Sequence, residues 1–401
     1  MTSKTIDELK GKIKELYDDK TGEFRVKFDA AIEGLQPPPV DPKSDIYKDW
    51  RGATGETLAE FFGEWYRWAW GQPIADGLLY IRKFSWISYK NDAGLAFVHS
   101  DSGRDVLADF TNLQGLQMDD PDSENLVRKW IDELGPKRMA DFKDGDWSTL
   151  NKFFIRELKP GSRWIDDSLD PSVVVAPTDC VINMIVDDLT DETPLPIKGG
   201  VTMNVGRLLA GSEYAEKFTG GTAVSCILMP DTYHRYHAPV GGEVVEARDD
   251  IGGVYYGIRD FPDLLNKGNV GYGYDYSLFE DFRRGYVIIK TPYLDHKGDP
   301  DGEGHVALVP VGLNSIGSVR FLEKFRNITE KSAPVEVRKG DEIGYFQYGG
   351  SLNILLFEAN RFPALQLLMG QRIGVLQEVA HTQRHMERYR RPQPGPFPPA
   401  S

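Results

Sequence analysis

Long apolar runs are missing from this sequence. No stretch approaches the roughly 18 uninterrupted apolar residues of a membrane-spanning helix. The segment before Asp19 also lacks the apolar core of a signal peptide. We therefore expect a soluble, cytoplasmic protein, and stable membrane insertion is not expected.

An excess of positive charge is also missing, and cysteine is scarce. The chain has 47 Lys and Arg against 61 Asp and Glu, which gives a net charge of −14. This balance argues against nucleic acid as a partner and against adsorption to anionic lipid. Only Cys180 and Cys226 are present, without the spacing of metal ligands. The sequence thus predicts two free, buried thiols in a reducing compartment and no metal site.

Helical patterns fill the first part of the chain, and we expect residues 1–150 to form a mostly helical domain. Residues 5–8 form a capping box, in which Thr5 and Glu8 are the reciprocal partners. Apolar residues recur at helical spacing at 6–16, 57–70, 78–89 and 124–134. Aromatic residues crowd the second and third of these segments, which favours a covered helical core over an aromatic substrate wall. The proline-rich segment 35–42 is typical of an extended linker.

From Phe153 onward the pattern changes to short strands separated by Gly and Pro. The strand candidates are 173–175, 181–186, 223–228, 242–247, 286–290, 306–311 and 354–357. A helix is expected within 198–210, and the acidic segment 295–305 is interpreted as a solvated hairpin loop because it lacks the last ligand of a calcium loop. We expect an α+β protein with a β-rich domain at 151–389 and a disordered proline-rich tail at 390–401.

The stretch 338–357, RKGDEIGYFQYGGSLNILLF, places a glycine pair between two strand patterns. One interpretation is a tight turn, because paired glycines are common at turns. The other is a bond that the chain cuts itself, between Gly350 and Ser351. The serine hydroxyl would attack the preceding carbonyl, and glycine tolerates the strain of about 1–3 kcal/mol that this requires. Elimination across the Cα–Cβ bond of Ser351 and hydrolysis of the resulting dehydroalanine would leave a pyruvoyl group.

A serine hydroxyl needs a base, because it is a weak nucleophile at its ordinary pKa. His237 is the candidate base, and Asp179 would fix its tautomer as in a Ser-His-Asp triad. His234 is the candidate for protonating a carbanion, because histidine exchanges protons near neutral pH. We expect 230–232 to cap one helical turn that places both histidines on one face. Structural hydrogen bonding and metal binding stay open as alternatives, although no third metal ligand is evident.

Six blocks in order carry a resemblance to a known family. They are FFIRELKPGSRWI, VVVAPTDCVI, IKGGVTMNVGRLLAG, TAVSCILMPDTYHRYHAPVGGEV, VALVPVGLNSIGSV and KGDEIGYFQYGGS. Over residues 153–357 the chain resembles the phosphatidylserine decarboxylase family of pyruvoyl enzymes. The resemblance implies that Asp179 and His237 are the triad partners of Ser351. The family usually has Gly after that aspartate, where this chain has Cys180, and a need for close approach there would weaken the Asp179 assignment.

The resemblance implies a decarboxylase whose pyruvoyl carbonyl forms a Schiff base with an amine and takes up electrons as carbon dioxide leaves. The preferred substrate is a soluble aromatic amino acid, because the helical extension is similar to that of tryptophan decarboxylase-like members and the chain is acidic. The alternative substrate is phosphatidylserine. The chains 1–350 and 351–401 are expected to stay associated. An unprocessed, non-enzymatic binding protein is the alternative from another class, but it would have no reason to combine an intact Gly350–Ser351 bond with Asp179 and His237.

Overall fold

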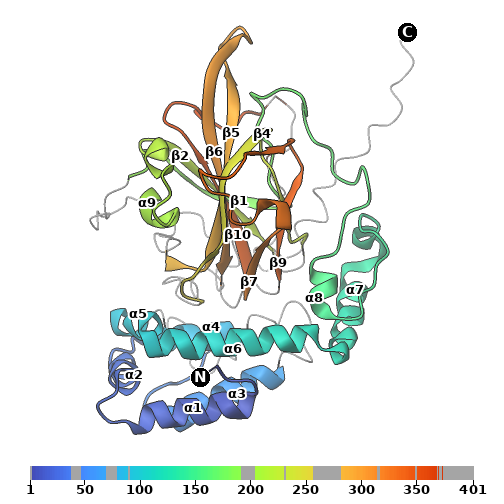
Figure 1. Cartoon of the computed structure of the whole chain (residues 1–401). Helices are drawn as coiled ribbons and strands as arrows, with labels where there is room; N and C mark the ends of the chain where they lie inside the picture. Colours follow the sequence, from blue (N-terminus) through green and yellow to red (C-terminus); the bar gives the residue numbers. More distant parts are fainter. Residues whose placement is uncertain are drawn as a thin grey trace.

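The structure is a computed structural model that describes residues 2–37, 47–68, 79–88, 91–190, 204–229, 232–255, 281–313, 317–347 and 350–367, with Met369 and Ile373. The linker predicted at 35–42 lies mostly outside these residues, and the tail predicted at 390–401 lies wholly outside them. Helices come first along the chain and strands follow (Figure 1). The helices are α1 (Ile6–Asp18), α2 (Glu23–Glu33), α3 (Gly55–Trp68), α4 (Leu79–Ser88), α5 (Asp92–His99), α6 (Asp101–Asp119), α7 (Glu124–Met139), α8 (Leu150–Phe154) and α9 (Val205–Leu208).

Local signals position the helix ends. The Thr5 hydroxyl accepts the backbone N–H of Glu8, and the Glu8 carboxylate accepts the backbone N–H of Lys4, so α1 begins where the capping box predicts. Gly135 has φ 72° and interrupts the helical geometry of α7, at the residue where the sequence pattern ends.

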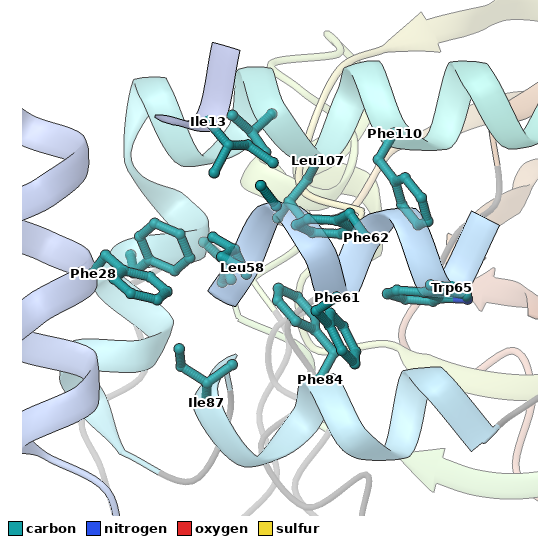
Figure 2. Packing of buried hydrophobic residues seen from close by; sticks show 14 of the residues in the cluster. Ile13, Phe28, Leu58, Phe61, Phe62, Trp65, Phe84, Ile87, Leu107 and Phe110 are labelled. Carbon is teal, nitrogen blue, oxygen red and sulfur yellow. The ribbon is translucent and has the colours of Figure 1, made fainter. Parts of the chain in front are cut away.

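The aromatic segments form the core of the helical part, as predicted. Figure 2 shows side chains of α3 and α4 packed among those of the neighbouring helices. Phe62 and Trp65 both contact Phe110 of α6, with ring centroids 4.6 Å and 4.8 Å apart. All three side chains are buried, and each aromatic pair adds ~0.5–1.5 kcal/mol beyond burial alone.

The strands form two antiparallel sheets, so the α+β prediction is confirmed. The strands are β1 (Val181–Val186), β2 (Thr222–Leu228), β3 (Arg235–His237), β4 (Gly242–Ile251), β5 (Arg284–Leu294), β6 (Pro300–Leu313), β7 (Ser318–Phe321), β8 (Val335–Val337), β9 (Glu342–Gln347) and β10 (Gly350–Phe357). The large sheet has the order β1-β2-β10-β6-β5-β4-β8, and the small sheet has the order β3-β9-β7. The strand prediction at 173–175 is wrong, because this segment belongs to no strand. The hairpin predicted at 295–305 is confirmed by the β5–β6 pairing, although only 295–299 form its loop and 300–305 belong to β6.

Each face of the large sheet contributes to a separate core. On one face, Leu352, Ile354 and Leu356 of β10 pack with α9 and its neighbours. On the other face, Leu355 and Phe357 pack with residues of the small sheet, and we call this layer the inter-sheet core. Because side chains alternate along a strand, each residue of β10 belongs to one layer or the other.

Helix α8 links the helical part to the inter-sheet core. Phe153 packs with Leu126 and Leu150, whereas its neighbour Phe154 belongs to the inter-sheet core. Within the part of the chain that the structure describes, no helix combines the length and apolarity needed to cross a membrane.

Candidate active site

Ser351 is the second residue of β10 and lies between Leu228 of β2 and Gly312 of β6. Alternation along the strand places its side chain on the same face as Leu355 and Phe357, toward the inter-sheet core. The side chain is fully buried, and its Oγ has no hydrogen-bond partner among the described residues. A buried polar group without a partner costs ~1–3 kcal/mol, so stability alone does not explain a serine here.

Gly350 opens β10 and pairs with Leu313 of β6. Strands β9 and β10 belong to different sheets, so the link between them crosses from the small sheet to the large one. Tyr348 and Gly349 of the predicted tight turn lie outside the described residues. The candidate bond therefore lies at the point where the chain enters the centre of the large sheet.

His234 is fully buried and stacks on Phe154, with ring centroids 3.8 Å apart. Its Nδ1 lies 2.9 Å from the carbonyl oxygen of Thr232, to which it donates, while Nε2 has no partner among the described side chains and backbone. Burial, together with the nearby Arg156 guanidinium, lowers the pKa of His234 to about 3. The imidazole is therefore neutral at physiological pH, with a lone pair on Nε2.

His234 is fixed by two segments that are connected to the surroundings of Ser351: the one that follows β2, and strand β9, which precedes β10 in the chain. Leu228, the residue opposite Ser351, ends β2, and the backbone N–H of Thr232 donates to the carbonyl of Met229, the residue after Leu228. The carbonyl oxygen of His234 accepts the backbone N–H of Phe346 in β9, at 2.9 Å. The β3–β9 register runs from Arg235 opposite Tyr345 to His237 opposite Glu342, so it places His237 further from the end of β9 that leads to Ser351.

The helical turn predicted for the two histidines is wrong, because residues 235–237 form β3 and pair with β9. Residues three apart in an extended segment point to opposite sides. Both ring nitrogens of His237 have partners: Nδ1 donates to the Gly340 carbonyl at 2.9 Å, and Nε2 accepts from the Tyr233 hydroxyl at 2.8 Å. Burial lowers the pKa of His237 and raises that of Tyr233, so the tyrosine keeps its proton and donates it.

Asp179 contacts Arg163, in an arrangement that differs from the predicted triad. Its two carboxylate oxygens accept Nε and Nη2 of Arg163, at 2.7 Å and 2.5 Å. The planar guanidinium matches both oxygens at once, which an imidazole cannot do. Arg163 also binds Asp141, at 3.0 Å. The hydrogen bond predicted between Asp179 and His237 is thus replaced by an ion pair, and the Gly340 carbonyl sets the histidine tautomer.

The structure nevertheless brings the two predicted blocks together. The Pro177 carbonyl accepts the backbone N–H of His237 at 2.8 Å, and the Thr178 hydroxyl donates to the Tyr233 carbonyl at 3.2 Å. Asp179 therefore lies next to the histidine segment, although it does not hydrogen-bond the imidazole. No group of three or more His, Cys, Asp or Glu within the described ranges is arranged to hold a metal ion.

A model of the phosphatidylserine decarboxylase family matches residues 150–381, more than half of the chain. The chain belongs to the phosphatidylserine decarboxylase family. The phosphatidylserine decarboxylase proenzyme of Fusobacterium nucleatum subsp. nucleatum is 30% identical over 275 residues, which is 68% of this chain and 80% of that protein. The proenzyme of Anoxybacillus flavithermus is 32% identical over 254 residues, covering 62% and 83%. Proenzyme 2 of Oryza sativa subsp. japonica is 29% identical over 304 residues, covering 72% of this chain but only 44% of that longer protein.

The family and enzyme class predicted from the sequence are thereby confirmed, and this phosphatidylserine decarboxylase family member is a carboxy-lyase. The matched segment begins at α8, so α1–α7 lie outside it. The resemblance of those helices to the extension of tryptophan decarboxylase-like members stays a prediction.

Two buried residues at the site were not singled out from the sequence. Arg156 donates to the carbonyls of Thr232 and Phe153 and lies over the ring of Phe142. Its position inside the block FFIRELKPGSRWI offered no signal of burial. Asn353 lies two residues after Ser351 and is fully buried. A polar residue in the apolar run 352–357 was a signal that could have identified it.

Proposed function

We propose that the chain is a proenzyme that cuts itself between Gly350 and Ser351 and then decarboxylates phosphatidylserine to phosphatidylethanolamine. Ser351 carries the proposal: it is a buried hydroxyl directly after a glycine, and its Oγ has no partner among the described residues. The relatives described above are named phosphatidylserine decarboxylase proenzymes, which supports self-processing. Those names also favour the lipid substrate over the free aromatic amino acid preferred from the sequence.

In the cutting step, Ser351 Oγ attacks the carbonyl carbon of Gly350, and the C–N bond breaks as the Ser351 amine takes up a proton. The amide becomes an ester. Removal of the Ser351 α-proton then expels the Gly350 carboxylate, and hydrolysis of the dehydroalanine releases ammonia.

His234 is the better candidate for moving the first proton, because its Nε2 lone pair is not engaged by a described residue, whereas His237 Nε2 already accepts from Tyr233. We assign His237 to positioning, since it ties the Gly340 turn to the Tyr233 segment.

The pyruvoyl group at residue 351 would supply an electrophilic carbonyl that takes up electrons as carbon dioxide departs. His234 would then return a proton to the reacting carbon. The pKa of about 3 belongs to the substrate-free protein. An anionic substrate beside the imidazole favours its protonated form and raises this pKa, so substrate binding would turn a neutral base into a proton donor.

The two chains are expected to remain together after the cut. The downstream chain begins at the second residue of β10, and from there the strand pairs with β2 along seven positions and with β6 along seven. Its apolar residues contribute to both cores. Separation would expose these strands, and this cost supports a stable two-chain enzyme.

Intact-protein mass spectrometry tests the proposal. We expect chains that end at Gly350 and begin at residue 351, the second with a pyruvoyl N-terminus, and conversion of phosphatidylserine in mixed vesicles to phosphatidylethanolamine. A single uncut chain of 45.1 kDa would contradict self-processing and favour the non-enzymatic binding protein. A cut protein that releases carbon dioxide from free tryptophan but not from the vesicles would overturn the lipid substrate.

A further inference from the structure

Asn353 is a buried amide next to the proposed cut. It lies in β10 opposite Cys226 of β2 and Pro310 of β6, two residues beyond Ser351. Its side chain is fully buried, and neither Oδ1 nor Nδ2 has a hydrogen-bond partner among the described residues.

This amide differs from other buried amides in the described part of the chain. Gln117 and Asn151 each leave their oxygen without a partner, but their nitrogens donate to Tyr66 O and Asp119 Oδ1, both at 2.9 Å. In Asn353, neither the amide oxygen nor the amide nitrogen forms a hydrogen bond with a described residue. An apolar side chain of similar volume would avoid a cost of ~1–3 kcal/mol for each unpaired group. A buried amide at this position is thus unfavourable for stability, which is common for residues that bind a ligand.

The side chain of Asn353 faces the same layer as Ser351. Residues two apart on a strand share a face and lie roughly 7 Å apart. That face contributes Leu355 to the inter-sheet core, which also contains Phe154, the ring on which His234 stacks. Ser351, Asn353 and His234 thus each bring a buried polar atom without a described partner to this layer.

We infer that Asn353 recognises the substrate, by donating a hydrogen bond from Nδ2 to the carboxylate of the seryl headgroup. This inference rests on the proposed function, in which the substrate amine reacts at residue 351. The carboxylate is carried on the carbon next to that amine and therefore lies within a few bonds of residue 351. A neutral amide suits a group that must leave as neutral carbon dioxide, because a cation would hold the charged ground state more tightly than the transition state.

The inference is tested by binding without turnover. The cut protein is treated with borohydride, which reduces the pyruvoyl carbonyl to an unreactive alcohol, and glycerophosphoserine is titrated in a calorimeter. We expect Asn353→Leu to weaken binding about tenfold or more, the effect of one hydrogen bond to a charged group. Asn353→Asp should weaken it further by repelling the carboxylate. Glycerophosphoethanolamine, which lacks the carboxylate, should bind wild type and Asn353→Leu equally.

Ser225→Ala is the matched control. Ser225 is also buried with an Oγ that lacks a described partner, but it lies on β2 opposite Ile354, which packs on the other face of the large sheet. This variant should bind glycerophosphoserine as wild type does. Wild-type affinity in Asn353→Leu, equal weakening for both probes, or tighter binding by Asn353→Asp would each overturn the inference. The inference would also be overturned if Asn353→Leu stayed uncut while wild type is cut. An uncut wild type, in contrast, would contradict the proposed function itself.

Discussion

The ring of Phe154 stacks on the imidazole of His234, with 3.8 Å between their centroids. Phe154 ends α8, and its neighbour Phe153 packs with Leu126 and Leu150 in a different core. Arg156 follows two residues later and binds the Thr232 carbonyl, to which the His234 ring also donates. The segment that joins the helical part to the strands therefore sets both the burial and the electrostatic surroundings of the candidate catalytic histidine.

This environment predicts a pH-dependent stability. The pKa of His234 is about 3 in the folded chain and 6.5 for an ordinary histidine, so only the unfolded chain takes up this proton as the pH falls below 6.5. The His234 contribution is complete above pH 6.5 and is lost progressively down to about pH 3. Between pH 6.5 and 5, we expect a loss of about 2 kcal/mol in the free energy of unfolding that His234→Asn does not show.

Urea unfolding at several pH values measures this difference, with all proteins in the uncut Ser351→Ala background. His296→Asn is the control, because His296 is exposed at the tip of the β5–β6 hairpin and its loss should leave the wild-type pH dependence intact. Equal pH slopes for wild type and His234→Asn would show that the imidazole is not held in its neutral form.

Local patterns in the sequence predicted much of the fold. The capping box at Thr5 located the start of α1, and the short apolar run at 352–357 located β10. Such signals work because they depend on neighbours in the chain. The burial of Ser351 also follows from its place beside an apolar run, which must lie inside a sheet.

Contacts between distant residues could not be predicted in this way. The Gly340 carbonyl that binds His237 lies 103 residues further along the chain. The assignment of β9 and β10 to separate sheets likewise depends on pairings that the sequence pattern does not encode. Asp179 was predicted to bind an imidazole, and Arg163 was not considered as its partner, although a guanidinium binds a carboxylate with two bonds.

Ser351→Ala should remain a single chain without loss of stability. The change removes the nucleophile, and it also removes a buried hydroxyl that has no partner among the described residues. We therefore expect the free energy of unfolding of Ser351→Ala to equal that of another uncut variant, or to exceed it by up to about 1 kcal/mol. Ser351→Thr serves as this second variant if it also fails to cut. Ser225→Ala should cut at the wild-type rate. Mass spectrometry follows the cut, and fragments of Ser351→Ala that divide after Gly350 would exclude the proposed chemistry.

His237 can be tested as a positioning residue by comparing two substitutions. Asn retains an N–H near the place of Nδ1 and can donate to the Gly340 carbonyl, whereas Ala cannot. We expect His237→Ala to slow self-cleavage about tenfold or more, the effect of ~1.4 kcal/mol on the barrier, and His237→Asn to recover most of the rate. A chase after cell-free translation measures the uncut fraction over time. If both variants fail equally, His237 acts as a base and not through Gly340.

The Arg163–Asp179 ion pair predicts that the two residues act as one unit. It anchors the end of the segment that lies against Tyr233 and His237. Arg163→Lys keeps the charge but loses the two-bond geometry, so we expect it to slow self-cleavage as much as Asp179→Asn does. The double variant should be no slower than the worse single one, with a coupling of roughly 0.5–3 kcal/mol in a double-mutant cycle.

Arg51→Lys provides the matched control for this cycle. Arg51 also binds both oxygens of a carboxylate, that of Asp49, but this pair is exposed in the helical part of the chain. Its loss should leave the cutting rate unchanged, because an exposed ion pair contributes little to stability. Normal cutting by Arg163→Lys together with failure of Asp179→Asn would mean that the carboxylate acts on the His237 imidazole directly. The cleavage-competent chain would then have to break the ion pair and turn Asp179 toward the histidine, as the triad prediction requires.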